Sequence, residues 1–381
     1  MTIHWCGTGL STVPGLRRLI AAGEPKVVVW NRTVAKAAEA VGDLTDDIRA
    51  FDPAALQAVL APGDVVVSML PADRHVELAR MAIAAGAHFV SSSYIAPEMR
   101  ALDGDAKAAN VALMNEVGLD PGIDHLMAHD LVEAYRASGV HTPETVLSFT
   151  SYCGGVPKVP NDFRYKFSWS PLGVLKALRA PSRSLREFEV FEAGRPWEAL
   201  SRYEAPLPTR ESFEVYPNRD SLPFMEQYRF DPDWRVREFV RGTLRLDGWA
   251  AAWDGVFREV ERLAGPEGDA RLAEMAEGFW QAHAYGEGEA DRVVLFVSLK
   301  AERDGTVVWH QSWAMDAWGD DRGSAMARLV SHPVALAVMA AARGELAPGV
   351  QAAPHNPALV RGWLAEVGRQ AQYLERIDHL A

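Results

Sequence analysis

Short apolar runs alternate with segments of helical spacing over the first third of the chain. Between the apolar runs, apolar positions recur at three- and four-residue intervals, which predicts helices at 53–60, 77–85 and 97–109. Strands separated by helices of this length form parallel βαβ units. The pattern therefore predicts a doubly wound parallel sheet over residues 1–122. Its strands are expected at 3–6, 26–30, 47–51, 64–70, 88–91 and 111–114.

Beyond residue 122 the pattern changes to longer loops and alternating apolar positions. These features predict a second, α+β domain at 123–345, which carries a short helical insertion at about 248–288. Helices from about 345–381 can complete the first domain. The expected elements are a helix at 123–137, a strand at 146–152 that ends in a Gly154-Gly155 turn, a hairpin of 293–300 and 306–314, and an apolar helix at 324–342 interrupted near Pro333.

The two patterns meet in the stretch from Met114 to His125. The last strand of the first domain is followed by an Asp-Pro-Gly turn signal and then by a helix start. In open α/β sheets, ligands bind at the carboxyl ends of the strands. We therefore expect chemistry at this corner, where three carboxylates lie: Glu116, Asp120 and Asp124.

A glycine loop follows the first expected strand. Gly7 permits a tight turn, and Gly9 lets the backbone approach a pyrophosphate that the next helix would bind at its N-terminus. Thr12 stands at the position of the third glycine of the fingerprint. The loop alone is a weak signal, because an ordinary turn has the same composition.

The second strand ends in Asn31-Arg32-Thr33, the position at which a dinucleotide's ribose is recognised. No acidic residue stands there, whereas an arginine with polar neighbours accommodates the 2′-phosphate of NADP. We predict NADP, with NAD possible if Arg32 points to solvent. The alternative is a solvated loop with Thr33 as the helix N-cap. Hydroxyl groups at two further strand ends, Ser68 and Ser91–Ser93, suit either a cofactor site or a plain turn.

Arginines follow strand and turn signals in the second domain, at Arg219, Arg241 and Arg245. A guanidinium group binds a carboxylate through two parallel hydrogen bonds, so this set favours a polycarboxylic acid as substrate. Each arginine taken alone fits a surface ion pair with a nearby Asp or Glu better than a binding role. Several together favour the binding role.

Composition narrows the class of protein. The 381 residues are 48% hydrophobic and carry a formal net charge of −12, which argues against a nucleic-acid partner. We see no apolar run long enough for a membrane span, and the two cysteines suit a reducing cytoplasm. His125 and His129 share a helix face, but no third ligand is evident, so we predict no metal.

Several motifs resemble those of the saccharopine dehydrogenase family, in particular its glutamate-forming saccharopine reductases. They extend through nearly the whole chain in the same order. The insertion at 248–288 departs from the family's pattern, because it is shorter than the corresponding insertion in the fungal members. The motifs are Ser93-Tyr94, Asn115–His125, Ser151–Gly155, Tyr165–Trp169, Tyr216–Ser221, Arg241–Arg245 and Ser324–Ala327.

The resemblance implies a Rossmann-type fold and a small amino-acid substrate. The implied reaction oxidises the secondary amine of saccharopine to give L-glutamate and 2-aminoadipate 6-semialdehyde. Asp120, Cys153 and Tyr94 are the matching polar positions for proton transfer, although which of them acts stays open. We expect Arg219 and Arg245 to bind substrate carboxylates, with Thr243 and Gly154 also in contact with the substrate.

Further expectations concern the cofactor contacts and the assembly. We expect a homodimer. The alternatives are a related opine-like or carboxypolyamine dehydrogenase, and an NADP-binding sensor without turnover. The expected cofactor contacts are Gly7, Gly9, Leu10, Ser11, Thr12, Asn31, Arg32, Thr33, Ser68, Leu70, Ser92, Val117 and Leu119.

Overall fold

The computed structural model describes residues 1–381, and the chain divides into two compact units. The first unit comprises Met1–Leu126 and Met326–Gln370, and the second comprises Met127–Ala325 and Ala371–Ala381. The boundaries expected at 122 and 345 differ from this division. The difference from the boundary expected at 345 arises from helix α12 (Ala325–Ala342), which belongs to the first unit from Met326 on.

The sheet of the first unit is parallel throughout, with the strand order β15-β6-β5-β4-β1-β2-β3. The chain runs outward from β1 to β3 and then resumes beside β1 with β4. The order therefore reverses between β1 and β4, where ligands bind in sheets of this type. The expected six strands are present, and a seventh, β15, joins them. The strands are β1 (Thr2–Cys6), β2 (Lys26–Asn31), β3 (Ile48–Ala50), β4 (Val65–Ser68), β5 (His88–Ser91), β6 (Ala112–Met114) and β15 (Gly349–Gln351).

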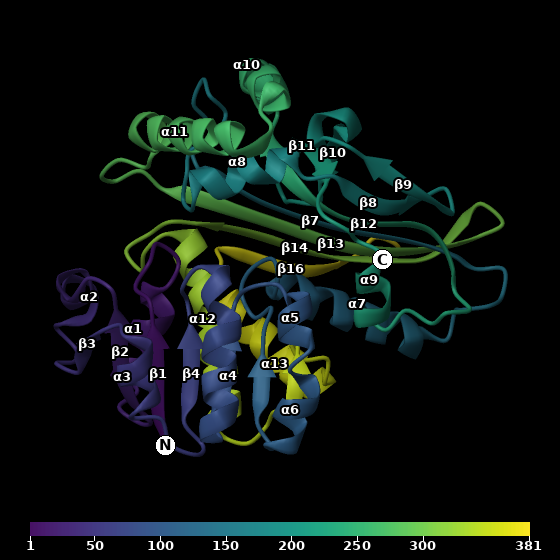
Figure 1. Ribbon diagram of the computed structural model, residues 1–381. Helices are drawn as coiled ribbons and strands as arrows, with labels where there is room; N and C mark the ends of the chain where they lie inside the picture. The colour runs from purple at the N-terminus through teal and green to yellow at the C-terminus, as the bar shows by residue number, and fades with distance from the viewer. The chain divides into compact units, whose positions relative to one another are not determined.

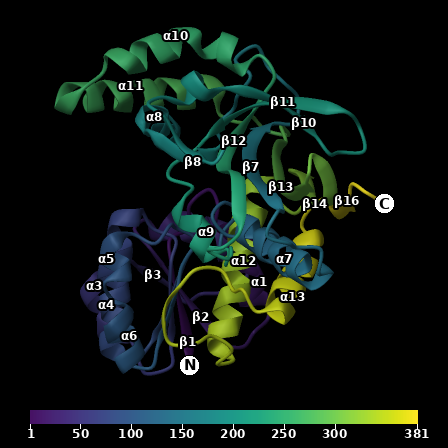
Figure 2. The same cartoon turned by 90° about the vertical axis from the view of Figure 1, so that its right-hand side faces the viewer.

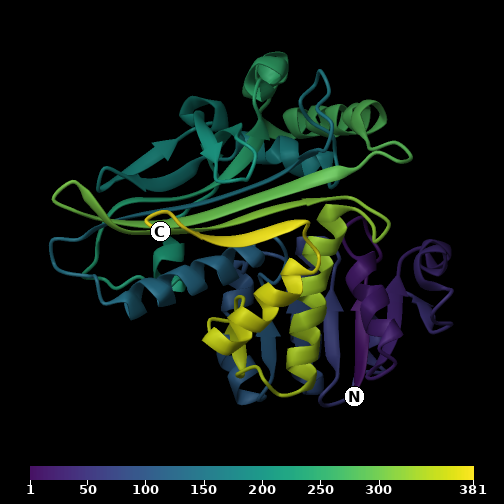
Figure 3. The ribbon, with the colours of Figure 1, turned by 180° about the vertical axis from the view of Figure 1, so that it is seen from behind.

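Helices cover both faces of this sheet, which is why its strands are nearly continuous apolar runs. Figure 2 shows α4, α5 and α6 along one face and α1, α12 and α13 along the other, and Figure 3 shows α12 and α13 from behind. The helix expected at 97–109 is divided into α5 and α6. The helices are α1 (Val13–Ala21), α2 (Val34–Val41), α3 (Pro53–Gln57), α4 (His75–Ala85), α5 (Pro97–Arg100), α6 (Asp103–Ala108) and α13 (Pro357–Gly368), with a 3-10 turn at Ala72–Arg74.

Helix α12 is the most apolar helix of the chain by its pattern. It has 18 residues, a mean hydropathy of 1.5 and 72% of that window buried, so it is long and apolar enough to cross a membrane by length and composition alone. The buried core helix of a folded domain passes the same test, so this helix is weak evidence of a membrane span. The interruption expected near Pro333 is absent, because Pro333 lies inside a continuous helix.

The second unit has a mixed sheet of nine strands, in which β12 pairs with β7 in parallel and the other pairs are antiparallel. The hairpin predicted around Asp304-Gly305 is confirmed as β13–β14. The strands are β7 (Val146–Pro157), β8 (Ser182–Arg186), β9 (Glu189–Ala193), β10 (Ser201–Ala205), β11 (Glu211–Pro217), β12 (Arg235–Leu246), β13 (Asp291–Arg303), β14 (Thr306–Trp318) and β16 (Tyr373–Asp378).

The helical insertion packs on this sheet through aromatic side chains. Figure 1 shows α8, α10 and α11 on one face of the sheet. Trp249 and Trp253 of α10 are fully buried in one core cluster with apolar residues of α8 and α11. Within this insertion, a break between Arg262 and Gly265 separates α10 from α11. The helices are α7 (Ile123–Ser138), α8 (Pro171–Arg179), α9 (Pro223–Gln227), α10 (Trp249–Arg262) and α11 (Gly265–His283), with a 3-10 turn at Pro196–Ala199.

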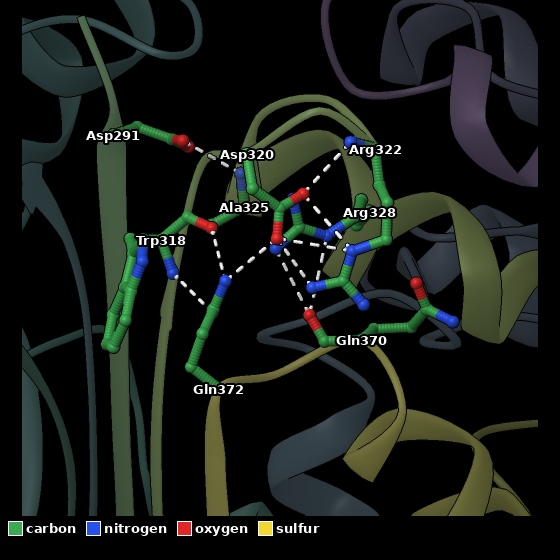
Figure 4. Close-up of polar contacts among 8 residues, drawn as sticks. All are labelled: Asp291, Trp318, Asp320, Arg322, Ala325, Arg328, Gln370 and Gln372. Carbon is green, nitrogen blue, oxygen red and sulfur yellow. Dashed lines mark hydrogen bonds and ion pairs between the residues drawn. The ribbon is translucent and has the colours of Figure 1, made fainter.

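The C-terminus differs from the helical segment expected at 345–381. Only β15 and α13 join the first unit, whereas β16 pairs with β14 in the second. The side-chain amide of Gln372 donates to the Trp318 carbonyl oxygen at 3.1 Å and to the Asp320 carboxylate at 2.9 Å (Figure 4). These contacts fix the start of β16 beside the loop that follows β14.

Candidate functional site

The glycine loop lies at the point where the strand order of the first sheet reverses. Gly7 has a φ of +104°, and a Cβ atom there would lie 2.8 Å from the Met69 carbonyl oxygen, which follows β4. Only glycine fits this position. Gly9 is exposed, and a Cβ there would meet no atom within 4 Å. The backbone of this loop is therefore open to a ligand at Gly9.

Two threonines of this loop have different roles. The Thr12 hydroxyl donates to the Gly9 carbonyl oxygen at 2.9 Å, so it closes the turn that precedes α1. Thr8 was not among the expected residues, yet its Oγ1 is buried without a hydrogen-bond partner. Buried hydroxyl groups are normally paired, so an unpaired one at a loop of this kind fits a bound ligand. Between these threonines, Leu10 is exposed and Ser11 is half-buried.

The N-terminus of α1 is suited to an anion. No side chain caps it and its first turn has no acidic residue, so the Val13 N–H has no partner within the helix. Pro14 has no N–H, and the Gly15 N–H donates to the Ser331 hydroxyl at 2.8 Å. The Val13 N–H and the positive end of the helix dipole therefore suit a phosphate.

The end of β2 presents the residues expected to distinguish NADP from NAD. The Asn31 side chain accepts from the Thr8 N–H at 3.2 Å and donates to the Thr33 carbonyl oxygen at 2.8 Å, so it braces the two loops. Thr33 occupies the N-cap position of α2, but its hydroxyl forms no capping hydrogen bond, contrary to the capping alternative. Arg32 is exposed and forms no ion pair. The Arg32 guanidinium and the Thr33 hydroxyl are therefore available to a phosphate.

The strand end at β4 leads into a buried polar chain. The Ser68 hydroxyl is fully buried and bonds to Nδ1 of His75 at 2.8 Å, and Nε2 of His75 bonds to the Ser93 hydroxyl at 2.7 Å. Burial lowers the pKa of His75 to about 4, so the ring is neutral near pH 7. Ser68 thus supports the loop at the end of β5 and does not itself lie at the surface.

The other residues expected to contact the cofactor are half-buried or buried. Leu70 packs against the core of the first unit, and Val117 and Leu119 are 0% and 5% exposed. Ser92 is half-buried, and a Cβ at Gly118 would lie 3.0 Å from its Cβ. These side chains shape the strand ends beneath the loop backbone.

Two of the three proposed proton-transfer residues lie together. The Tyr94 hydroxyl, after β5, donates to Oδ1 of Asp120, after β6, at 3.0 Å. Both side chains are partly exposed. The first unit therefore presents a phenol–carboxylate pair at the carboxyl edge of its sheet.

The second unit places Cys153 in a row of polar side chains across three strands. Cys153 on β7 is opposite Thr243 on β12, which is opposite Tyr216 on β11. Residues paired in register share one face of a sheet. Burial raises the pKa of Tyr216, and the charge of Arg245 opposes that rise. Neither Cys153 nor the second cysteine, Cys6, forms a disulfide.

Arg245 lies on the same face as this row, two residues after Thr243. It is 6% exposed, and its guanidinium carbon lies 4.9, 5.6 and 5.4 Å from the ring centroids of Tyr165, Tyr216 and Trp249. One N–H donates to the Leu244 carbonyl oxygen at 3.2 Å, while Nε is buried without a partner. No carboxylate pairs with Arg245, so a buried cation lacks a counter-ion in this chain.

The remaining substrate positions are distributed along β12. Arg241 is 4% exposed and its guanidinium stacks on Phe224 at 3.9 Å. Arg219 is exposed, in the turn where the Asn218 N–H donates to the Arg241 carbonyl oxygen at 2.9 Å. Arg219 is therefore at the Arg241 end of the strand, away from Arg245.

Gly154 has a packing role in this structure. The turn expected at this position is absent, because β7 continues to Pro157. A Cβ at Gly154 would lie 2.6 Å from the Leu244 carbonyl oxygen, so the neighbouring strand requires a glycine. Contact between Gly154 and a substrate stays a prediction.

The parallel sheet, the glycine loop and the arginine after β2 define the first unit as a dinucleotide-binding domain of the Rossmann type. Residues 4–114 match the NADP-binding domain of saccharopine dehydrogenases, and residues 118–372 match the C-terminal domain of the same proteins. The chain belongs to the saccharopine dehydrogenase family.

Relatives of known activity agree with this family. The chain is 37% identical over 250 residues to saccharopine dehydrogenase (NADP+, L-glutamate-forming) of Pyricularia oryzae, an alignment that covers 64% of this chain and 54% of the relative. It is 35% identical over 258 residues to the Saccharomyces cerevisiae enzyme of the same name, with the same coverage. These alignments thus span about half the length of the curated relatives, at 54%.

The fold agrees over a longer stretch than the sequence. The solved structure of L-glutamate-forming saccharopine dehydrogenase from Saccharomyces cerevisiae superimposes with a TM-score of 0.80 at 26% identity, and it covers 99% of both chains. The two-domain α/β architecture predicted from the pattern is therefore confirmed.

Proposed function

We propose that this chain is a saccharopine dehydrogenase that converts saccharopine, NADP+ and water reversibly into L-glutamate, 2-aminoadipate 6-semialdehyde, NADPH and a proton, in lysine metabolism. Family membership and the names of the fungal relatives support the reaction. The observation that carries the substrate class is Arg245, a buried cation without a carboxylate partner in the chain.

The arginines favour a substrate that carries several carboxylates. A buried charge without a partner is costly, and a substrate carboxylate would compensate it through charge-assisted hydrogen bonds. Arg241 and Arg245 are four residues apart on β12, which is about 13 Å along an extended strand. With Arg219 at the Arg241 end, cations lie at both ends of the segment, which suits an elongated polycarboxylic acid. A polyamine, which is itself cationic, would be repelled by this set.

The cofactor in this proposal is NADP, and the residues of the first unit fit it. The Val13 N–H at the start of α1 and the backbone at Gly9 would hold the pyrophosphate. The Thr8 hydroxyl would gain the partner that it lacks, and Arg32 and Thr33 would bind the 2′-phosphate. When bound, NADP+ accepts a hydride from the carbon next to the substrate nitrogen.

Proton transfer is assigned to the Tyr94–Asp120 pair of the first unit. Asp120 accepts the proton that the secondary amine loses on oxidation, and the Tyr94 hydroxyl, which donates to Asp120, stabilises its charged form. Water then adds to the resulting imine carbon, and the C–N bond breaks to release the amine of glutamate and the aldehyde. Thr243 orients the substrate as a neutral donor, and Cys153 lines the same sheet face.

The test is the absorbance of reduced nicotinamide at 340 nm while the purified chain is incubated with saccharopine and either NADP+ or NAD+. We expect reduction of NADP+ to be faster, and Asp120→Asn to remove most of the rate while NADP+ binding persists. If the chain binds NADP+ but never reduces it with saccharopine, the substrate assignment is wrong. Turnover with another secondary-amine acid would then indicate a different opine-type substrate.

Compartment and assembly belong to the same proposal. We place the protein in the cytoplasm, where two cysteines outside any disulfide stay reduced. We further propose a homodimer. Light scattering of the purified chain measures its mass, and a monomer at micromolar concentration would contradict the second statement.

A further inference from the structure

A buried histidine and two buried acidic side chains lie together in the first unit, in the same stretch of chain as Asp120. His125, at the start of α7, is fully buried between two carboxylates. Its Nε2 lies 3.0 Å from Oε2 of Glu116, and its Nδ1 lies 3.3 Å from Oδ2 of Asp124. Glu116 is 3% exposed and Asp124 is 0% exposed. The proposed chemistry uses none of these three side chains.

The two acidic side chains fix the orientation of the ring. The Nε2 and Nδ1 atoms of His125 face different carboxyl groups, so the ring is held between Glu116 and Asp124. Asp124 is further fixed by the Gly122 N–H, which donates to its Oδ1 at 2.6 Å. This arrangement gives Glu116 a single orientation.

Glu116 in turn holds the backbone on both sides of Tyr94. Its Oε1 accepts from the Ile95 N–H at 2.9 Å, and its own N–H donates to the Ser93 carbonyl oxygen at 3.1 Å. Glu116 adopts a φ of +55°, a region that residues other than glycine rarely occupy. A strained backbone of this kind persists only where its surroundings hold it.

We propose that His125 is a positioning residue that acts through Glu116 on Tyr94 and so sets the geometry of the Tyr94–Asp120 pair. Deletion of the imidazole removes the contact between Nε2 of His125 and Oε2 of Glu116. Glu116 then loses its fixed orientation, and the Ser93–Ile95 segment moves with it. The catalytic consequence rests on the proposed function, but the structural consequence does not.

A purely structural role for His125 makes a different prediction. A core histidine would affect folding stability without a specific effect on one tyrosine hydroxyl. His129, one turn later on α7, provides the matched control, because it is also buried and packs edge-on against Tyr228 with 5.7 Å between the ring centroids. The same substitution, histidine to glutamine, is made at both positions.

The first experiment needs no turnover. The chain has nine tyrosines, and labelling of each at Cζ with 13C gives an NMR signal that reports the hydrogen bond of its hydroxyl. The signal that Tyr94→Phe removes belongs to Tyr94. We expect His125→Gln to shift this signal and His129→Gln to leave it in place. An unchanged Tyr94 signal in folded His125→Gln, or an equal shift in His129→Gln, overturns the proposal. If His125→Gln does not fold, Glu116→Gln carries the same test.

The second experiment is a double-mutant cycle on saccharopine oxidation. A misplacement of about 1 Å can cost about a hundredfold in rate, so we expect His125→Gln to lower kcat by about that factor with the KM for NADP+ unchanged. In a Tyr94→Phe background the same substitution should cost less than about twofold further. Losses that multiply fully would show that His125 does not act through Tyr94. An inactive wild-type chain would count against the proposed function only, and the NMR result would still decide the role of His125.

Discussion

Replacement of Arg245 by methionine should separate substrate binding from folding stability. Methionine has a similar length and packs well against aromatic rings, so it can fill the space between Tyr165, Tyr216 and Trp249. The change removes a cation that has no carboxylate partner in the chain. We therefore expect binding of saccharopine to fail while the fold persists.

The magnitudes follow from the contacts. A bidentate pair between Arg245 and a substrate carboxylate comprises two charge-assisted hydrogen bonds, each worth about 1.5–3 kcal/mol, so a loss of at least about 3 kcal/mol is expected. That corresponds to roughly a hundredfold in kcat/KM. For folding, the lost cation–π contacts cost about 1–2 kcal/mol, and relief from burying an unpaired charge opposes this cost. The net change in stability should therefore be small.

The assay is steady-state kinetics with saccharopine varied at saturating NADP+, alongside thermal unfolding of the free protein. Arg245→Met should raise the KM for saccharopine strongly and leave the KM for NADP+ unchanged. Arg245→Lys, which keeps the charge but loses the planar fork, should be intermediate. An unchanged KM for saccharopine in Arg245→Met would refute the assignment. A large fall in the unfolding temperature would instead show that Arg245 is a structural residue.

Three further substitutions test the first unit. Arg32→Ala should weaken the binding of NADP+ by about tenfold or more and the binding of NAD+ hardly at all, because only NADP+ carries the 2′-phosphate. Equal losses of affinity for the two cofactors, measured by fluorescence titration, would contradict this. Gly9→Ala should leave the thermal midpoint unchanged, since the new Cβ meets nothing within 4 Å, yet weaken NADP+ binding, and an unchanged dissociation constant would place the pyrophosphate elsewhere. Burial lowers the pKa of His75 from 6.5 to about 4, so the unfolded chain binds a proton that the folded chain lacks, and stability falls by about 3 kcal/mol from pH 6.5 to 4. Urea unfolding of His75→Asn over this range should show a shallower decline than wild type.

Much of the first unit could be predicted because its signals are local. Buried parallel strands appear as apolar runs such as Val65–Val67, and the positions where the chain must turn are marked by glycine or proline. The strand ends then fall at one edge of the sheet. For this reason Asn31, Ser68 and Ser92 could all be assigned to that edge before their contacts were known.

The elements that were missed depend on contacts between distant parts of the chain. β15 is only three residues long, and it is a strand because β6 offers a free edge. β16 looks amphipathic and short, and its pairing with β14 decides its structure. α12 is assigned to the first unit by packing such as the Gly15 N–H that donates to the Ser331 hydroxyl at 2.8 Å. No window of sequence contains both partners of these contacts.

The same distinction explains the site residues. Arg245 could be proposed as a carboxylate ligand from its residue type, but its value as a candidate comes from what surrounds it. Tyr165 lies 80 residues earlier in the chain and Trp249 four residues later, and their ring centroids lie 4.9 and 5.4 Å from the guanidinium carbon. Thr8 escaped notice for the converse reason, since its hydroxyl is distinctive only through the absence of a partner. A sequence records which groups can form a bond, whereas only the fold reveals which of them have been left without one, and those groups are the strongest indication of where a ligand binds.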